Sequence, residues 1–308
     1  MKAIAEAPSK VIITGEHFVV HGAWALAAAI PRTVTVEVEE SQTFAVRSGL
    51  YPSRHAALRP LGEVVEAMAR EYSFSPKVRV SVRSNVRGGA GLGSSASTMV
   101  ALASALSRLH SLGLGVEEVV RLSMVGEAGV HGHPSGIDPT VCALGGVIMF
   151  RPGSSPRRLR LDQTRSLLVS FSGKTRSTRG QINRVAEVSE KYPGLFSGLV
   201  ESASAVSEMA AERLARNDMK GLGKLLSFNH AVLSNLGVSN ENLDRLVDAS
   251  LSLGSYGAKL TGAGGGGSVI SVAPEGKQKR ITSGLNARGY ETFRAKIPVR
   301  GVRSWLES

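Results

Sequence analysis

A glycine-rich segment between a predicted strand and a predicted helix constrains this chain more than any other feature. Residues 88–97 read GGAGLGSSAS. They follow an alternating segment, 77–84, that is typical of a strand, and they open 94–111, whose apolar residues recur with helical spacing. Glycines allow backbone N–H groups to turn toward a ligand, and a helix N-terminus carries a partial positive charge. The segment therefore predicts a phosphate-binding loop, although a serine that caps a helix after a flexible turn would give the same pattern.

A second glycine-rich segment lies near the C-terminus. Residues 259–268 read KLTGAGGGGS and formally contain the dinucleotide-binding pattern G-x-G-x-x-G. That pattern requires a helix after the glycines, whereas the residues that follow, 268–272, have strand character. Five glycines in six residues are costly in chain entropy, so we expect this backbone to approach a ligand or the first glycine loop closely.

A third segment, 126–139, carries two carboxylates of interest. Glu127 lies near the end of a predicted helix, where its charge opposes the helix dipole, so we expect it to have a positive partner such as a metal ion. Asp138 precedes Pro139, and this pair by itself is typical of a helix N-cap and first turn.

The composition is that of a soluble protein. The chain has 308 residues, 42% of them hydrophobic and 20% charged, which is enough for two domains with filled cores. Its longest apolar runs are far shorter than the roughly 20 residues that a membrane-spanning helix needs. The N-terminal residues resemble neither a secretory signal nor a transit peptide, and the single cysteine, Cys142, excludes an internal disulfide. We therefore expect a cytoplasmic protein.

The formal net charge of +12 allows a different class of function, that of a nucleic-acid-binding protein. However, the basic residues are spread along the chain, with only 157–160 approaching a cluster, and 5% of the residues are aromatic. Single-strand binders interleave aromatic residues with basic ones. We therefore expect a basic, solvated surface that attracts anionic substrates, and neither nucleic acid nor membrane as a partner.

Strand and helix patterns in two blocks predict an α+β protein. A break around 151–165 divides the chain into an N-terminal domain, 1–155, and a C-terminal domain, 156–308. In the first domain we expect strands over 2–14, 33–39 and 77–84 and helices over 58–72, 94–111 and 116–130. In the second we expect several helices between 177 and 253, another over 275–287, and strands over 167–171, 259–272 (with a turn) and 290–297. The cleft between the domains is the expected place for a ligand.

Together with an N-terminal stretch, 7–17 (APSKVIITGEH), the three segments resemble the motifs of the GHMP kinases, in the order found in that family. The match spans nearly the whole chain. Within the family, the stretches most similar to the mevalonate kinase branch, of archaeal type, are 15–22 (GEHFVVHG), 131–138 (HGHPSGID) and 176–179 (RSTR). Two departures could alter nucleotide affinity: Ser9 stands where a glycine is usual, and 86–88 (VRG) where prolines often precede the phosphate loop.

The resemblance implies the GHMP kinase fold, in which an N-terminal domain like domain 2 of ribosomal protein S5 packs on a ferredoxin-like C-terminal domain. It implies ATP and Mg²⁺ as cofactors, mevalonate as the small-molecule substrate, and a homodimer as the assembly. The reaction it implies is transfer of the γ-phosphoryl group of ATP to the 5-hydroxyl of mevalonate, a step of isoprenoid biosynthesis.

The resemblance also implies roles for individual residues. Asp138 would accept the proton of the alcohol, Lys10 would lie beside it, and Mg²⁺ would be held by Ser95 and Glu127. The residues that would bind the nucleotide are Gly89, Ala90, Gly91, Leu92, Gly93, Ser94, Ser95, Ala96, Gly264 and Gly265. The residues that would hold the substrate are Glu16, His17, Arg176 and Thr178. A buried structural histidine is the alternative for His17, and a solvated surface arginine is the alternative for Arg176.

Other GHMP kinases stay open as alternatives: a phosphomevalonate kinase, a mevalonate 3-kinase or a sugar kinase. A galactokinase would normally have an aspartate soon after the Gly-Glu-His motif, where this chain has 18–21 (FVVH). That difference weakens the interpretation as a sugar kinase.

Overall fold

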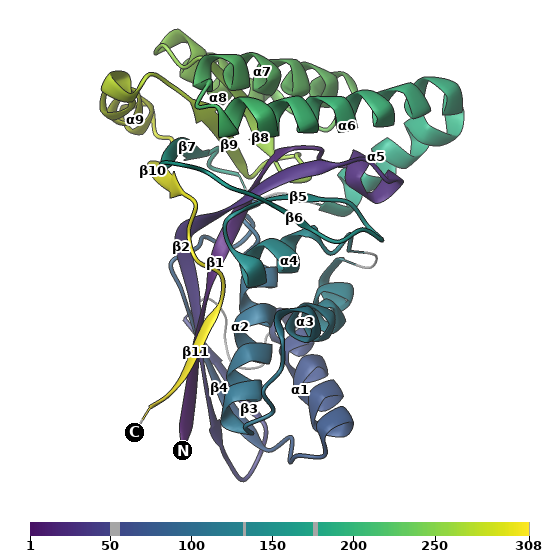
Figure 1. Ribbon diagram of the computed structural model, residues 1–308, viewed down its shortest axis with the longest axis vertical. Coiled ribbons are helices and arrows are strands. Elements are labelled where there is room, and N and C mark those ends of the chain that lie inside the picture. The colour runs from purple at the N-terminus through teal and green to yellow at the C-terminus, as the bar shows by residue number, and fades with distance from the viewer. Residues whose placement is uncertain (50–55, 132–133, 175–177, 308) are drawn as a thin grey trace.

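The computed structural model describes residues 1–49, 56–131, 134–174 and 178–307, and within these ranges the chain forms two sheets with helices packed on them (Figure 1). This mixture of helices and sheets confirms the predicted α+β class. No helix in the described ranges has the length and apolar character needed to cross a membrane.

The first sheet has seven strands in the described part of the chain. Its order is β11-β1-β2-β4-β3, and β5 and β6 extend it from β2. The strands are β1 (Lys2–Thr14), β2 (Ala25–Glu40), β3 (Ala45–Ser48), β4 (Val78–Ser84), β5 (Val147–Phe150), β6 (Arg157–Leu159) and β11 (Arg303–Glu307). The helices of this part are α1 (Arg59–Tyr72), α2 (Ser94–Leu109), α3 (Val116–His131) and α4 (Ile137–Leu144). They lie together along one side of the sheet in Figure 1.

The second sheet is antiparallel and has four strands, in the order β10-β7-β9-β8. The strands are β7 (Arg165–Phe171), β8 (Gly257–Thr261), β9 (Ser268–Val272) and β10 (Thr292–Ile297). The helices of this part are α5 (Thr178–Lys191), α6 (Pro193–Ala215), α7 (Met219–Asn235), α8 (Glu241–Ser252) and α9 (Gln278–Ala287). Figure 1 shows α6, α7 and α8 as a layer at the top of the molecule, above this sheet.

Two strands differ from the sequence-based expectation. The strand predicted over 33–39 begins at Ala25, because its first half, Ala25–Ala28, pairs with β5 and its second half, Val34–Glu40, pairs with β4. The final strand, β11, was not predicted. It pairs antiparallel with β1, so the last described residues belong to the first sheet. The division of the chain at residue 155 stays a prediction.

Strand β1 lies where the two halves of the molecule meet. The first half is the seven-stranded sheet with α1 to α4, and the second half is the four-stranded sheet with α5 to α9. From Ser9 onward all its residues are buried, because helices cover one face of the sheet and the second half of the molecule packs against the strand. Ile12 lies in a small apolar cluster with Ile137 and Val141 of α4. Side chains along a strand alternate between faces, so Lys10 shares the face of Ile12, toward α4.

The two halves are also joined by hydrogen bonds of one threonine. The Thr261 hydroxyl, at the end of β8, accepts a hydrogen bond from the backbone N–H of Ile12 and donates one to its carbonyl oxygen, both at 2.9 Å. This exchange fixes the end of β8 against the last residues of β1.

Candidate active site

The first glycine loop forms the wall of a cavity of about 370 Å³. The loop connects β4 to α2, and its glycines Gly89, Gly91 and Gly93 have φ values of 72°, 82° and 75°, in the left-handed region that favours glycine. The residues predicted to bind phosphates that line this cavity are Gly89, Ala90, Gly91, Leu92, Gly93, Ser94, Ser95 and Ala96. A cavity that ends on the first turn of a 16-residue helix is suited to an anion.

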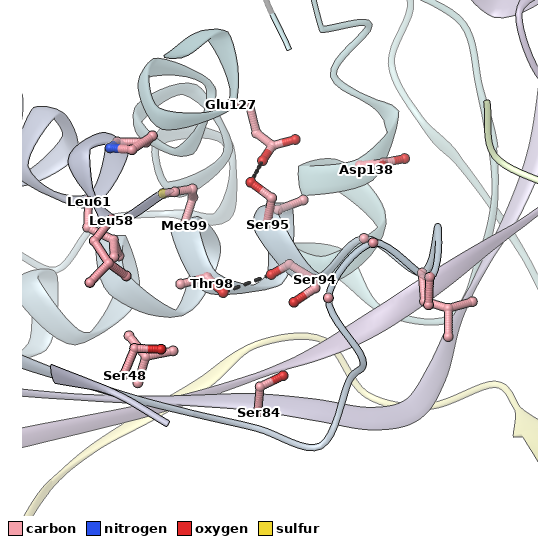
Figure 2. Close-up of a pocket in the computed structure, with 18 of the residues that line it drawn as sticks. Ser48, Leu58, Leu61, Ser84, Ser94, Ser95, Thr98, Met99, Glu127 and Asp138 are labelled. Carbon is pink, nitrogen blue, oxygen red and sulfur yellow. Dashed lines mark hydrogen bonds between the residues drawn. The ribbon is translucent and has the colours of Figure 1, made fainter. Parts of the chain in front are cut away.

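The cavity has an apolar end and a polar end. Figure 2 shows Leu58, Leu61 and Met99 on one side and Ser95, Glu127 and Asp138 on the other. Because the phosphate loop lies toward the polar end, a nucleotide could place its base against the apolar side chains and its phosphates on the loop.

Ser95 and Glu127 lie in direct contact. The Ser95 hydroxyl donates a hydrogen bond to Oε1 of Glu127 at 2.5 Å, and the Glu127 side chain is buried (Figure 2). Glu127 belongs to the last turn of α3, where the helix dipole disfavours a negative charge. The pair presents a hydroxyl and a carboxylate, which are the oxygen donors that magnesium prefers.

Lys10 and Asp138 form an ion pair beside the loop. Nζ of Lys10 lies 2.9 Å from Oδ1 of Asp138 and 3.5 Å from the carbonyl oxygen of Gly91. The Lys10 side chain is 1% exposed and that of Asp138 is 23% exposed, so the carboxylate can be reached from the cavity and the ammonium is enclosed. Asp138 lies in the first turn of α4, whose N-cap is Gly136, so the aspartate is not the cap itself.

A second cavity, of about 310 Å³, adjoins the first, and Glu127 and Asp138 line both. Its walls come from both halves of the molecule. Lys10, Glu16 and His17 line it from β1 and the turn that follows, while Gly262 and Ala263 line it from the second glycine loop. Apolar residues of α4 and α5 complete it, among them Ile137, Ile182 and Val185.

The turn after β1 is held by the second half of the molecule. Nε2 of His17 lies 2.9 Å from the carbonyl oxygen of Ala263, and Glu16 forms an ion pair with Lys259 of β8. Both side chains of the pair are almost completely buried. Burial raises the pKa of the Glu16 carboxyl and lowers the pKa of the Lys259 ammonium, and the attraction between the two groups opposes both shifts.

The second glycine segment approaches the first one, which is one of the two alternatives expected from the sequence. The Ser268 hydroxyl donates to the carbonyl oxygen of Ala90 at 2.8 Å, and a Cβ on Gly267 would lie 3.0 Å from the same oxygen. Gly264 and Gly265 do not line either cavity. A Cβ on Gly264 would meet the carbonyl oxygen of Val238 at 2.1 Å, and one on Gly265 would meet the Gln181 amide at 2.5 Å. These two glycines permit close packing of the chain on itself, and their nucleotide contact stays a prediction.

The remaining predicted substrate residues are not placed by the structure. Arg176 lies outside the described residues. Thr178 begins α5, but its side chain is also outside the described part. Sequence reasoning missed Lys259, the one charged residue of the buried strand β8. The one sequence signal for Lys259 was its place within a predicted strand, because a charge in a fully buried strand requires a partner.

Comparisons with known proteins agree with this geometry. The family model described as the GHMP kinases N terminal domain matches residues 59–146, and the GHMP kinases C terminal model matches 210–291. A mevalonate kinase of Aeropyrum pernix is 36% identical to this chain, and the match covers 98% of each chain. A mevalonate kinase of Thermococcus sibiricus is 35% identical, again with 98% of each chain covered.

Solved structures extend the comparison. The L. major mevalonate kinase, solved in complex with R-mevalonate, has a TM-score of 0.83 at 29% identity, with 96% of each chain covered. The Methanococcus jannaschii mevalonate kinase also has a TM-score of 0.83, at 27% identity, covering 96% of this chain and 98% of that one. A Streptococcus pneumoniae phosphomevalonate kinase shares the fold at 16% identity, with a TM-score of 0.83 and coverage of 96% and 99%.

Proposed function

The chain belongs to the GHMP kinase family, and from this premise we propose that it catalyses the ATP-dependent phosphorylation of the 5-hydroxyl of mevalonate. The observation that carries the proposal is the Lys10–Asp138 ion pair, which lies where the two cavities meet. A phosphoryl donor in the first cavity and an alcohol in the second would approach each other beside this pair. The relatives named mevalonate kinase support mevalonate as the alcohol.

In this reaction the alcohol oxygen attacks the γ-phosphorus, the bond to the β–γ bridging oxygen breaks, and ADP leaves. The carboxylate of Asp138 accepts the proton of the alcohol, and it is reachable from the cavity for that purpose. The Lys10 ammonium is fixed 2.9 Å from this carboxylate, so its positive charge lies where the alcohol oxygen becomes negative. The loop N–H groups and the first turn of α2 orient the phosphates. Positioning and charge neutralisation supply most of the catalysis in such transfers.

Ser95 and Glu127 fit a magnesium ion. Their two oxygens are in contact at the polar end of the first cavity, and no group of three His, Cys, Asp or Glu in the described ranges forms a protein-only metal site. Magnesium usually takes one or two protein oxygens and completes its shell with phosphates and water. When bound, it would neutralise charge on the β- and γ-phosphates.

The proposal is tested with the purified protein, ATP and MgCl₂ against mevalonate, 5-phosphomevalonate, galactose and homoserine, with ADP release as the readout. We expect turnover with mevalonate, and ³¹P and ¹H NMR of the product should place the phosphate on the C5 oxygen. Turnover of another alcohol in preference to mevalonate, or a phosphate on the C3 oxygen, would refute the assignment. A homodimeric assembly stays a prediction of the resemblance, and a cytoplasmic location stays a prediction from the composition.

A further inference from the structure

Lys259 and Glu16 form an ion pair that joins the two halves of the molecule, and the side chains of both residues are buried. Lys259 lies in the centre of β8 and is 0% exposed, and Glu16 lies in the turn after β1 and is 1% exposed. The ammonium of Lys259 also donates to the carbonyl oxygen of Leu260 at 2.5 Å. The reaction proposed at the Lys10–Asp138 pair assigns no step to Lys259, although Lys10 lies near enough to influence the pKa of both Glu16 and Lys259.

Lys259 forms the ion pair with Glu16, and Lys10 adds a weaker attraction to the same carboxylate. Oε1 accepts the hydrogen bond from Lys259, whereas Oε2 is buried and accepts no hydrogen bond in the described part of the chain. A buried carboxylate that loses its cation is strongly destabilised where it stands, so it moves or takes up a proton. Removal of the Lys259 charge should therefore displace the turn that carries Glu16.

That turn forms a wall of the second cavity. Glu16 and His17 line the cavity, and the backbone of His17 has a φ of 62°, a value that residues other than glycine rarely adopt. Such a conformation persists only where the surroundings determine it. Here two contacts from the second half of the molecule hold the turn: Lys259 on Glu16, and the carbonyl oxygen of Ala263 on His17.

We propose that Lys259 is a positioning residue for the acceptor alcohol, which acts by holding the Glu16–His17 turn as a wall of the second cavity. This inference rests on the proposed function. The first cavity is lined by the 88–96 loop and does not include Glu16, His17 or Lys259. Lys259 should therefore affect recognition of the alcohol and leave recognition of ATP unchanged.

Thr261 provides a matched control. It lies two residues after Lys259 on the same strand, is equally buried, and also joins β8 to the first half of the molecule, through Ile12. In the described residues its hydroxyl is hydrogen-bonded to Ile12 and not to Glu16. A variant Thr261→Val thus weakens the contact between the halves without removing the partner of the carboxylate.

The experiment measures kcat and the KM values for mevalonate and ATP in the wild type and in K259M, E16Q, E16Q/K259M and T261V, with thermal unfolding as a check of folding. We expect K259M to raise the KM for mevalonate by about tenfold to a hundredfold, because small misplacements of binding groups have effects of that size. The KM for ATP should change by less than about twofold in K259M, and both KM values by less than about twofold in T261V. The double variant should be no worse than E16Q, because Lys259 acts through Glu16.

Three results would overturn the inference: an unchanged KM for mevalonate in folded K259M, an equal rise in T261V, or a further large rise when K259M is added to E16Q. If K259M alone does not fold, the KM for mevalonate of the double variant is compared with that of E16Q. Neither of these variants holds an unpaired carboxylate at position 16, and a large difference between them would overturn the inference. Wild-type turnover of mevalonate tests the proposed function separately. Failure of that assay is therefore distinct from failure of the variant comparison.

Discussion

The ammonium of Lys10 and the carboxylate of Asp138 lie 2.9 Å apart, although one belongs to the first strand and the other to the fourth helix. Lys10 reaches Asp138 because α4 packs on the strand face that Lys10 shares with Ile12. The cation is enclosed and the anion is open to the cavity. This arrangement is that of a base kept in place by a fixed positive charge.

Replacement of Asp138 by asparagine should remove the proton acceptor and leave the shape of the cavity nearly unchanged. We expect Asp138→Asn to lower kcat by about 10²–10⁴-fold, the range typical for loss of a general base. The dissociation constant for ATP, measured by calorimetry, should stay close to that of the wild type. Asp248→Asn, at an exposed position of α8, is the control with the same change of charge. Near-normal turnover in Asp138→Asn would show that another group accepts the proton.

Replacement of Glu127 by glutamine should weaken magnesium binding, because an amide lacks the negative charge of a carboxylate. In Glu127→Gln, the MgCl₂ concentration that gives half-maximal activity should rise by about tenfold or more. Glu117→Gln changes an exposed residue at the other end of the same helix and should leave the titration unchanged. Identical magnesium titrations for wild type and Glu127→Gln would exclude Glu127 as a ligand.

A side chain at position 93 should disturb catalysis through Lys10. Gly93 has a φ of 75°, and a Cβ there would lie 2.9 Å from Cγ of Lys10. Gly113 has a φ of 66°, but a Cβ there would have no neighbour within 4 Å. Both alanine variants should therefore lose about 1–2 kcal/mol of unfolding free energy from the left-handed backbone. Only Gly93→Ala should also show a large loss of kcat; equal activities in the two variants would contradict the contact with Lys10.

The thiol of Cys142 should be unreactive in the folded protein. Burial raises its pKa to about 12, so the thiol stays protonated, and therefore weakly nucleophilic, as the pH rises through 8 and 9. At pH 8 a chromogenic disulfide reagent should label the native protein very slowly and the urea-unfolded protein rapidly. Cys142→Ala gives the background signal. Rapid labelling of the native wild type would show that the site opens.

The first glycine loop could be predicted because its signal is local. The 88–97 segment stands between a strand pattern and a helix pattern, and Gly89, Gly91 and Gly93 adopt positive φ values. Lys10 and Asp138 were found through the resemblance, since their own surroundings are ordinary strand and helix-start patterns. The structure adds that the two residues are in contact, which requires α4 to dock on β1.

Other features depend on contacts between distant segments and could not be predicted. Lys259 is a single charge in a five-residue strand, and its role appears only when Glu16 is placed beside it. Strand β11 is short and mostly exposed, so it has little apolar alternation of its own, and it forms because β1 has a free edge. Gly264 and Gly265 were assigned to a ligand, but their close neighbours are Val238 and Gln181.

Because β11 returns to pair with β1, the second sheet and its helices are an insertion within the first sheet and are tethered to it twice. One tether is 160–164, between β6 and β7, and the other is 298–302, between β10 and β11. The buried Lys259–Glu16 pair and the hydrogen bonds between Thr261 and Ile12 join the same two sheets. The walls of the second cavity are therefore tied together both along the chain and through side chains in the interior.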